Sequence, residues 1–314
     1  MGSLGNTLFS QLAQEAELLG KLHKLKKYLQ DHLSDGLVVI VGSGLSCAEG
    51  LPSMGQLAIF LTEVLPPALL PEDLELWNQI APLLSSIGLE AALLKHQPSE
   101  DLEAAIVNAT VKCILPKERE IIANAVSGKT QLRFSKLLKH LYRPSGATTG
   151  IPVVTTNYDR LIEVGAELAG FGADTLFVGN YAGQIDHQKS FWGFCKGASR
   201  IVGKSVVNQL RERITLCKVH GSFDWYLRAT DNTPIRHMGD LDLSRLIITP
   251  GLNKYRNGYN SPFDTHRERA NHAISKATKI LIIGYGFNDD HLETHLKQKI
   301  RRCSTSIDRL ANRL

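Results

Sequence analysis

Asn157 and Asp159 are polar residues at a position where a ligand could bind. They lie in VVTTNYDRLIE (153–163), whose first half is β-branched and whose second half is typical of a helix. The amide offers a donor and an acceptor without a charge, and the carboxylate accepts hydrogen bonds. Ligands of open α/β sheets bind at the carboxyl ends of strands. The stretch therefore indicates either a ligand site or a plain helix cap by Asp159 with a buried Asn157.

His220 is a second candidate for chemistry, in the stretch CKVHGSFDW (217–225). It follows a strand-like run and precedes Gly221, so it occupies a position like that of Asn157. A histidine has an unperturbed pKa of about 6.5, which suits a general base near neutral pH. Asp224 and Trp225 follow, and we expect them to shape the wall of the same pocket.

The wholly apolar run LVVIV (37–41) leads into GSGLSCAEGLPSMG (42–55), which is interpreted as a glycine-rich turn before an apolar helix near 56–65. Gly42 and Gly44 flank Ser43, and glycines there allow a backbone to approach a pyrophosphate at a helix N-terminus. Ser46 adds a hydroxyl. The usual dinucleotide fingerprint has a third glycine where this chain has Cys47, so a simple strand-to-helix turn is the alternative.

A second glycine loop occurs in LIIGYGFNDDHL (281–292). Gly284 and Gly286 end another apolar run, and Asn288 and Asp289 precede a helical pattern. This loop suits the ribose or adenine end of a ligand, and a helix cap by Asn288 or Asp289 can exist at the same time. Adjacent acidic and histidine residues rarely converge on one ion, so we predict no metal site. Four such motifs at successive strand ends indicate one crevice.

The elements that must position these residues alternate between strand-like runs and helical patterns. This alternation predicts an α/β fold with a Rossmann-like, doubly wound parallel sheet. Residues 1–34 are assigned to an N-terminal helix and 35–314 to one domain with a helical insertion at about 66–145, in which Pro66, Pro67, Pro98 and Pro116 are breaks. The strand-like runs lie at 37–41, 151–156, 175–179, 215–221, 244–251 and 279–286.

Composition narrows the class of protein. The chain has 314 residues and a formal net charge of +5, and no apolar run reaches transmembrane length. Its five cysteines include no CxxC pair, which excludes a four-cysteine zinc module and favours a reducing, cytoplasmic location. The basic runs KLHKLKK and KQKIRR are interpreted as solvated helix faces, not as nucleic-acid contacts. The short polar tail leaves open that the chain is part of a longer protein.

The ordered motifs resemble the sirtuin superfamily, and are closer to its bacterial antiphage-defence branch of sirtuin-like NADases than to protein deacetylases. The resemblance covers roughly residues 35–300, with the helical insertion unmatched. It rests on GSGLS (42–46), GLPS (50–53), TTNYD (155–159), VHGSFDW (219–225) and IIGYGFNDDHL (282–292).

The resemblance implies an NAD site with particular residues in particular roles. Asn157 and His220 match the two residues that the family needs for chemistry, and Asp159 matches the position that contacts the nicotinamide amide. Tyr285 departs from the family's serine or threonine, which leaves that contact open. The cofactor-binding set comprises the phosphate-loop residues Gly42, Ser43, Gly44 and Ser46, the flexible-loop residue Pro52, Thr156 and Asp159 near the reacting end, and Gly284, Gly286 and Asn288 near the adenosine half.

The resemblance also implies an activity. Without the paired-cysteine zinc module of deacetylases, the expected function is metal-independent hydrolysis of NAD⁺ at the nicotinamide–ribose bond, serving abortive-infection defence against phage. An NAD-dependent protein deacylase and a non-catalytic sensor of NAD or ADP-ribose are the alternatives. Expected partners are further copies of the chain and a HerA-type ATPase or an Argonaute-like protein, with no membrane and no direct nucleic-acid contact.

Overall fold

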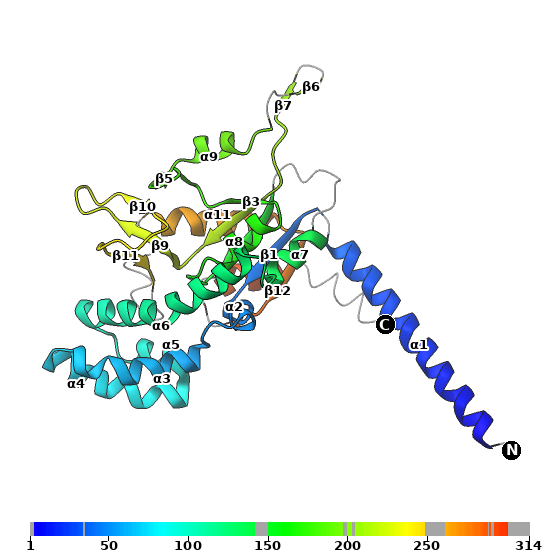
Figure 1. Cartoon of the computed structure of the whole chain (residues 1–314), viewed down its shortest axis with the longest axis horizontal. Coiled ribbons are helices and arrows are strands. Elements are labelled where there is room, and N and C mark those ends of the chain that lie inside the picture. Colours follow the sequence, from blue (N-terminus) through cyan, green and yellow to red (C-terminus); the bar gives the residue numbers. More distant parts are fainter. Residues whose placement is uncertain are drawn as a thin grey trace.

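A parallel sheet of five strands forms the centre of the protein, in the order β12–β1–β2–β8–β3 (Figure 1). The structure is a computed structural model that describes residues 3–33, 35–141, 150–196, 200–202, 205–248, 261–287, 289 and 292–300. Neighbouring strands all pair in parallel, which confirms the predicted α/β, Rossmann-like class. The strands are β1 (Leu37–Val41), β2 (Ile151–Thr155), β3 (Gly172–Asp174), β8 (Arg213–Lys218) and β12 (Lys279–Ile283).

The register of the sheet brings the predicted motifs to one edge. Val41 at the end of β1 pairs with Ile283 of β12 and with Thr155 of β2, and Thr155 pairs with Lys218 of β8. The four strands therefore end level with one another. The residues that follow them include Gly42, Asn157, His220 and Gly284, as the sequence predicts for a single crevice.

Both faces of the sheet are covered by helices, because β1 and β2 are apolar on both faces. On one face, Val39 and Val41 pack with α7 (Arg133–Leu141) and α8 (Leu161–Leu168). On the other, Val38 and Ile40 pack with α11 (Phe263–Lys276) and the helix at 292–300. Alternate residues of one strand thus face opposite helical layers, which is the doubly wound arrangement.

The glycine-rich segment after β1 is more helical than the sequence indicates. The prediction was one long turn from Gly42 to Gly55, whereas α2 (Ser43–Glu49) begins directly after Gly42. Gly50 closes this helix in the left-handed conformation, with a φ of 106°, which glycine adopts without steric cost. The next helix, α3 (Met54–Val64), begins with a capping box between Ser53 and Gln56.

The insertion is helical as predicted, and residues 142–145 of its expected range lie outside the described residues. It has a core of its own around Leu61, Trp77 and Leu93. Pro116 was expected to be a break but lies inside α6, where burial of apolar residues along the helix outweighs the missing backbone hydrogen bond. Within the predicted range lie η1 (Pro66–Ala68), α4 (Pro71–Ile80), η2 (Ala81–Leu83), α5 (Leu84–Lys95) and α6 (Glu100–Val126). α3 precedes this range but packs in the same core, whereas α7 lies within the range but packs against the parallel sheet.

A second, antiparallel sheet was not predicted. Its order is β11–β9–β10–β5–β4, and it takes up the runs at 175–179 and 244–251, which we had assigned to the parallel sheet. The edge of the parallel sheet is instead the short β3. The strands are β4 (Phe177–Val178), β5 (Gly183–Ile185), β9 (Gly221–Leu227), β10 (Pro234–Arg236) and β11 (Arg245–Ile247); elsewhere lie α9 (His187–Gly193) and the pair β6 (Arg200–Val202) and β7 (Ser205–Val207).

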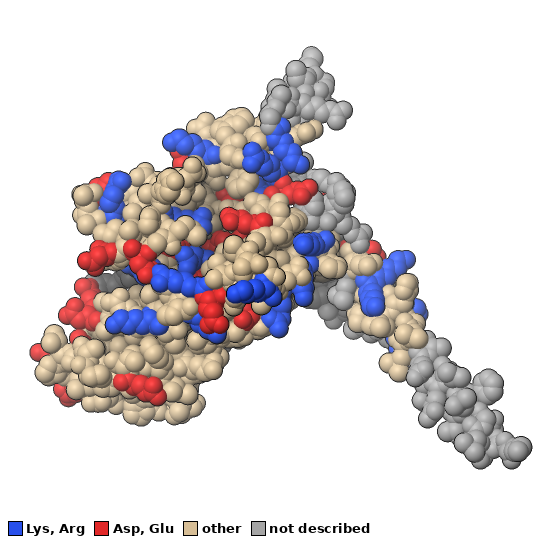
Figure 2. Space-filling model, viewed as in Figure 1, with Lys and Arg blue, Asp and Glu red and all other residues tan. Residues whose placement is uncertain are grey.

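The N-terminal helix α1 (Ser3–His32) projects from the body, to which its last turn is joined by Lys279 Nζ donating to Asp31 O at 3.1 Å (Figure 1). Leu18, Leu22 and Leu25 of α1 are exposed. On the face shown in Figure 2, acidic and basic side chains are interspersed over the body, whereas the insertion carries few charges. No helix in the described part of the chain is long and apolar enough to cross a membrane.

Candidate active site

A cavity of about 460 Å³ lies where the carboxyl edge of the parallel sheet meets the helical insertion. Its polar side comes from the strand ends and is formed by Ser43, Ser46, Thr156, Asn157, Asp159, His220 and Asp289. Its apolar side comes mainly from the insertion and from the second sheet, and includes Leu51, Met54, Leu57, Ile87, Leu89, Leu94, Ile106, Val107, Ile114, Phe223 and Ile247. A concave apolar site with a few convergent polar groups is typical of ligand pockets.

Asn157 is buried and its amide group is fixed by the protein. Its Nδ2 donates to Gly42 O at 3.0 Å and to Ser46 Oγ at 2.9 Å, so both N–H bonds are used. Among the described residues, no donor is hydrogen-bonded to Oδ1. Because Asn157 also lines the cavity, its carbonyl oxygen is the group available to accept a hydrogen bond from a water or a substrate hydroxyl.

Asp159 both accepts a hydrogen bond at the start of a helix and lines the cavity, so the two alternatives that the sequence left open hold together. Its Oδ1 accepts the Leu161 N–H at 3.1 Å at the start of α8, and its Oδ2 accepts the Ser46 hydroxyl at 2.7 Å. Burial raises the pKa of Asp159 to about 6, and the Glu118 carboxylate adds to this rise, whereas Lys218 and the Ser46 hydroxyl oppose it. A carboxyl group that titrates near neutrality in a cavity is a common feature of functional sites.

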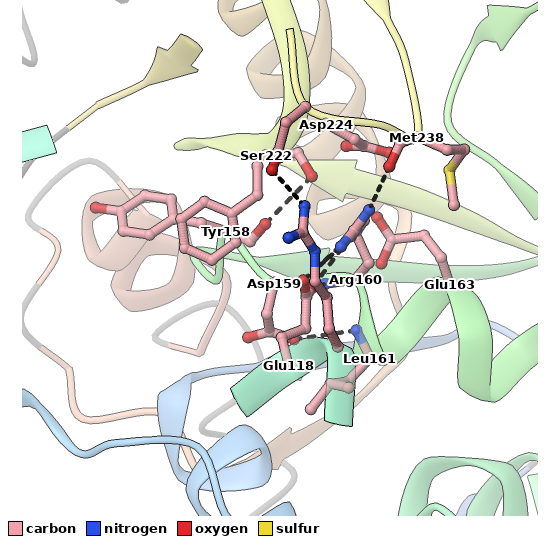
Figure 3. Close-up of polar contacts among 12 residues, drawn as sticks. Glu118, Tyr158, Asp159, Arg160, Leu161, Glu163, Ser222, Asp224 and Met238 are labelled. Atoms are coloured by element: carbon pink, nitrogen blue, oxygen red, sulfur yellow. Dashed lines mark hydrogen bonds and ion pairs between the residues drawn. The ribbon is translucent and has the colours of Figure 1, made fainter. Parts of the chain in front are cut away.

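Buried ion pairs hold the turn that carries Asn157 and Asp159 (Figure 3). Glu118 of α6 accepts from Arg160 Nη2 at 2.6 Å and from the Arg160 backbone N–H at 2.5 Å, and both side chains are buried. Lys218 of β8 donates to Glu163 at 2.9 Å and to the backbone oxygens of Tyr158 and Asp159. The insertion is thereby fixed to the turn by a charge-assisted contact.

These pairing residues were missed by the sequence analysis. Lys218 lies within an apolar strand run and Glu118 within a long helix, and neither position has a local motif. The one available signal was the charge itself, since a lysine at the end of a strand buried on both faces needs a partner.

His220 lies in the connection between β8 and β9 and contacts Asp289. Its Nε2 is 2.5 Å from Asp289 Oδ2, and its backbone oxygen accepts the Ile248 N–H at 2.9 Å. The expectation that Asp224 and Trp225 shape the pocket wall is wrong. Phe223 of β9 lines the cavity, and alternation along the strand turns Asp224 away from it to pair with Arg236 at 2.7 Å. Trp225 packs against Phe177 of β4 and His266 of α11.

Gly42, Gly44 and Gly284 form a close backbone contact between the two glycine loops. Gly44 N–H donates to Gly284 O at 2.9 Å, and a Cβ on Gly44 would lie 2.7 Å from Gly284 Cα. A Cβ on Gly42 would lie 2.5 Å from both Gly284 O and Tyr285 Cα. The structure therefore gives these glycines a packing reason that is separate from ligand binding.

The cavity brings together most of the residues predicted to bind the cofactor. Gly44 and Gly284 are outside its lining, and Asn288 lies outside the described residues. Tyr285, whose contact was left open, lines it. The predicted residues in the lining are Gly42, Ser43, Ser46, Pro52, Thr156, Asn157, Asp159, His220 and Gly286.

Comparison with protein families places this site in a known group. The family model of the SIR2-like domain matches residues 152–310, just over half of the chain. The chain belongs to the SIR2-like family. A comparison with curated proteins gave no match. The matched region includes Asn157, His220 and Asp289, and the SIR2-like family is one of NAD-dependent enzymes, so the function of the chain is related to NAD.

The site fits NAD in its chemistry. The Asn157 carbonyl, the Asp159 carboxyl and the imidazole of His220 line one side of the cavity, where ribose hydroxyls and a carboxamide find partners. The apolar side suits the pyridine ring. Within the described residues, no group of three or more histidine, cysteine, aspartate or glutamate side chains is placed to hold a metal ion, and Cys47, Cys113, Cys195 and Cys217 are free.

Proposed function

We propose that this SIR2-like protein hydrolyses NAD⁺ at the nicotinamide–ribose bond to give nicotinamide and ADP-ribose. The observation that carries the proposal is that Asn157 and His220 line the same cavity, opposite an apolar wall supplied by the insertion. A wall of this kind limits the access of bulk water to the reacting carbon. The family match supports NAD as the substrate class.

The proposed reaction needs little acid catalysis. Nicotinamide leaves with the electron pair of the broken C–N bond and becomes neutral, while positive charge develops on the ribose as in glycoside cleavage. A water oxygen then bonds to the ribose carbon, and its proton passes to His220. Asn157 Oδ1 orients this water or a ribose hydroxyl, and general-base help is typically worth ~10²–10⁴-fold.

A product assay tests this proposal against its alternatives. Full-length protein is incubated with NAD⁺, with and without an acyl-lysine peptide, and nicotinamide, ADP-ribose and acyl products are separated by chromatography. Hydrolysis predicts nicotinamide and ADP-ribose without peptide. Binding of NAD⁺ without any product would contradict the proposal and indicate a sensor.

A protein deacylase is the second candidate, and the apolar wall of the cavity is the observation that favours it. Leu57, Ile106 and Ile114 would accept an acyl chain as readily as a pyridine ring. Nicotinamide release that depends strictly on the acyl peptide would identify this activity instead.

The acidic limb of the pH profile tests the role of His220. As a base, His220 must be neutral, so activity should fall as the pH drops through the pKa of its imidazole, and His220→Ala should remove activity while NAD⁺ still binds. His140→Ala, at an exposed histidine of α7, is the matched control. A flat profile from pH 5 to 8, or an active His220→Ala protein, would contradict the assignment.

The proposed activity must be regulated, because unrestrained hydrolysis of NAD⁺ would kill the cell, and we propose that assembly of the protein provides this regulation. The exposed leucines of α1 and the exposed apolar residues Ile59, Leu70 and Ile87 of the insertion support contacts with further copies of the chain or with a partner. We propose a defence role against phage in the cytoplasm, with a HerA-type ATPase or an Argonaute-like protein as partner. Size-exclusion chromatography with light scattering tests self-association, and a monomer at all concentrations would contradict it.

A further inference from the structure

Asp289 uses its two carboxylate oxygens for different purposes. Its Oδ1 accepts the Leu292 N–H at 2.9 Å, and its backbone oxygen accepts the Glu293 N–H at 2.8 Å, as expected at the start of the helix at 292–300. Its Oδ2 lies 2.5 Å from Nε2 of His220. A helix cap needs one acceptor oxygen, which asparagine or serine supplies equally well. Compared with asparagine or serine, a carboxylate at this position therefore provides a second acceptor oxygen, the one that lies beside His220.

From this geometry we propose that Asp289 is a positioning residue that sets the tautomer of His220. It rests on the proposed function, in which His220 accepts the proton of the attacking water. When Oδ2 accepts the Nε2–H of the neutral ring, the lone pair belongs to Nδ1. The water proton passes to Nδ1, the resulting imidazolium keeps its hydrogen bond to the carboxylate, and the proton is then released to solvent.

The surroundings of His220 favour Asp289 as its anionic partner. Asp159, from the turn after β2, lines the same cavity but is bonded to Ser46 and to the Leu161 N–H. Lys218, from the same strand end, donates to Glu163 and to backbone oxygens of the turn. Asp289 is also buried, and a hydrogen bond to a carboxylate is stronger in such an environment than in water.

The variant Asp289→Asn distinguishes the role of Asp289 as a helix cap from its effect on the tautomer of His220. The Leu292 N–H still needs an acceptor, so the amide oxygen of the new side chain stays at the Oδ1 position and its NH₂ group faces His220. This NH₂ donates to Nε2, which leaves the hydrogen of the neutral ring on Nδ1. The variant therefore keeps the hydrogen bond at the helix start but reverses the tautomer of His220. Nδ1, the nitrogen that accepts the water proton in the wild type, then carries a hydrogen and has no lone pair to accept another.

Nitrogen-15 NMR of the imidazole in full-length protein reads the tautomer directly. We expect the Nε2–H form in the wild type and the Nδ1–H form in Asp289→Asn, because the carboxylate accepts a hydrogen bond from the ring whereas the amide group donates one to it. For nicotinamide release from NAD⁺, we expect kcat to fall at least about tenfold with little change in KM, since base catalysis is lost and binding is not.

Asp186→Asn is the matched control, because Asp186 caps α9 by accepting the Lys189 N–H at 2.8 Å and does not line the cavity. It should change neither the tautomer nor kcat. The same tautomer in the wild type and Asp289→Asn would overturn the inference, as would a wild-type kcat in that variant. A wild type that releases no nicotinamide would refute the proposed function alone, because the NMR comparison decides the tautomer without turnover.

Discussion

Replacing Asp159 with asparagine should stabilise the protein against unfolding more at pH 8 than at pH 5. Burial raises the pKa of Asp159 from 3.8 to about 6 in the folded protein. The folded state therefore binds this proton more tightly than the unfolded chain, and stability is lost as the pH rises between these two values. A pKa shift of about 2 units corresponds to about 3 kcal/mol in the free energy of unfolding, and all of this stabilisation is lost above the pKa of the folded state.

The asparagine side chain of the Asp159→Asn variant does not ionise, so this loss is absent from the variant. At pH 5 the Asp159 carboxyl is already largely ionised in the unfolded chain, so about half of the wild type's loss of stability is present there. The free energy of unfolding of the variant relative to the wild type should therefore rise by about 1.4 kcal/mol between pH 5 and pH 8. Asparagine keeps an acceptor for the Leu161 N–H. Urea unfolding followed by tryptophan fluorescence measures the difference, since Trp77 and Trp225 are buried in the insertion and in the second sheet.

Asp186→Asn is the control for this experiment also, since Asp186 begins a helix on the surface and its pKa is lowered by hydrogen bonds to Lys189. Its difference from the wild type should not widen with pH. An advantage of Asp159→Asn that stays constant or shrinks between pH 5 and pH 8 would refute the argument that burial of this carboxylate opposes folding.

Three further predictions concern the packing of the site and its metal content. Gly44→Val should lower the free energy of unfolding by about 1–3 kcal/mol, measured as a lower urea midpoint, because its side chain would collide with Gly284, whereas Gly193→Val in open space should not. Equal stability of Gly44→Val and the wild type would contradict the contact between the two glycine loops. Glu118→Gln should cost about 3–5 kcal/mol because Arg160 stays buried without its counter-charge, and a loss below about 1 kcal/mol would contradict this. Activity should survive EDTA because a neutral leaving group needs no Lewis acid, and loss of activity that zinc restores would overturn this.

The parts of the fold that could be predicted are those with a strong local pattern. LVVIV is apolar throughout, as a strand covered on both faces must be, and KILII is apolar after its first residue. The glycines that follow the two runs mark the edge at which the site forms. The level strand ends then bring Asn157 and His220 to one cavity. The second sheet could not be predicted from such patterns, because several of its strands, such as β4 and β11, have two or three residues each.

The remaining features of the site depend on contacts between distant segments. Residues of α6, such as Ile114, line the cavity, while the sequence of this helix shows only its periodicity. Asp289 was recognised as a helix cap, and its contact with His220 joins two residues that are far apart in the chain. Glu118 and Arg160 likewise meet only in the folded protein, across 42 positions.

Nicotinamide release under single-turnover conditions tests the central claim most directly. Full-length protein in excess over NAD⁺ carrying a labelled nicotinamide makes even a slow reaction measurable. Asn157→Ala is compared with Asn78→Ala, which changes an exposed asparagine of α4. We predict stoichiometric release of nicotinamide by the wild type and by Asn78→Ala, and none by a folded Asn157→Ala protein that still binds NAD⁺. Equal release by Asn157→Ala, or none by a wild type that binds NAD⁺, would contradict the account.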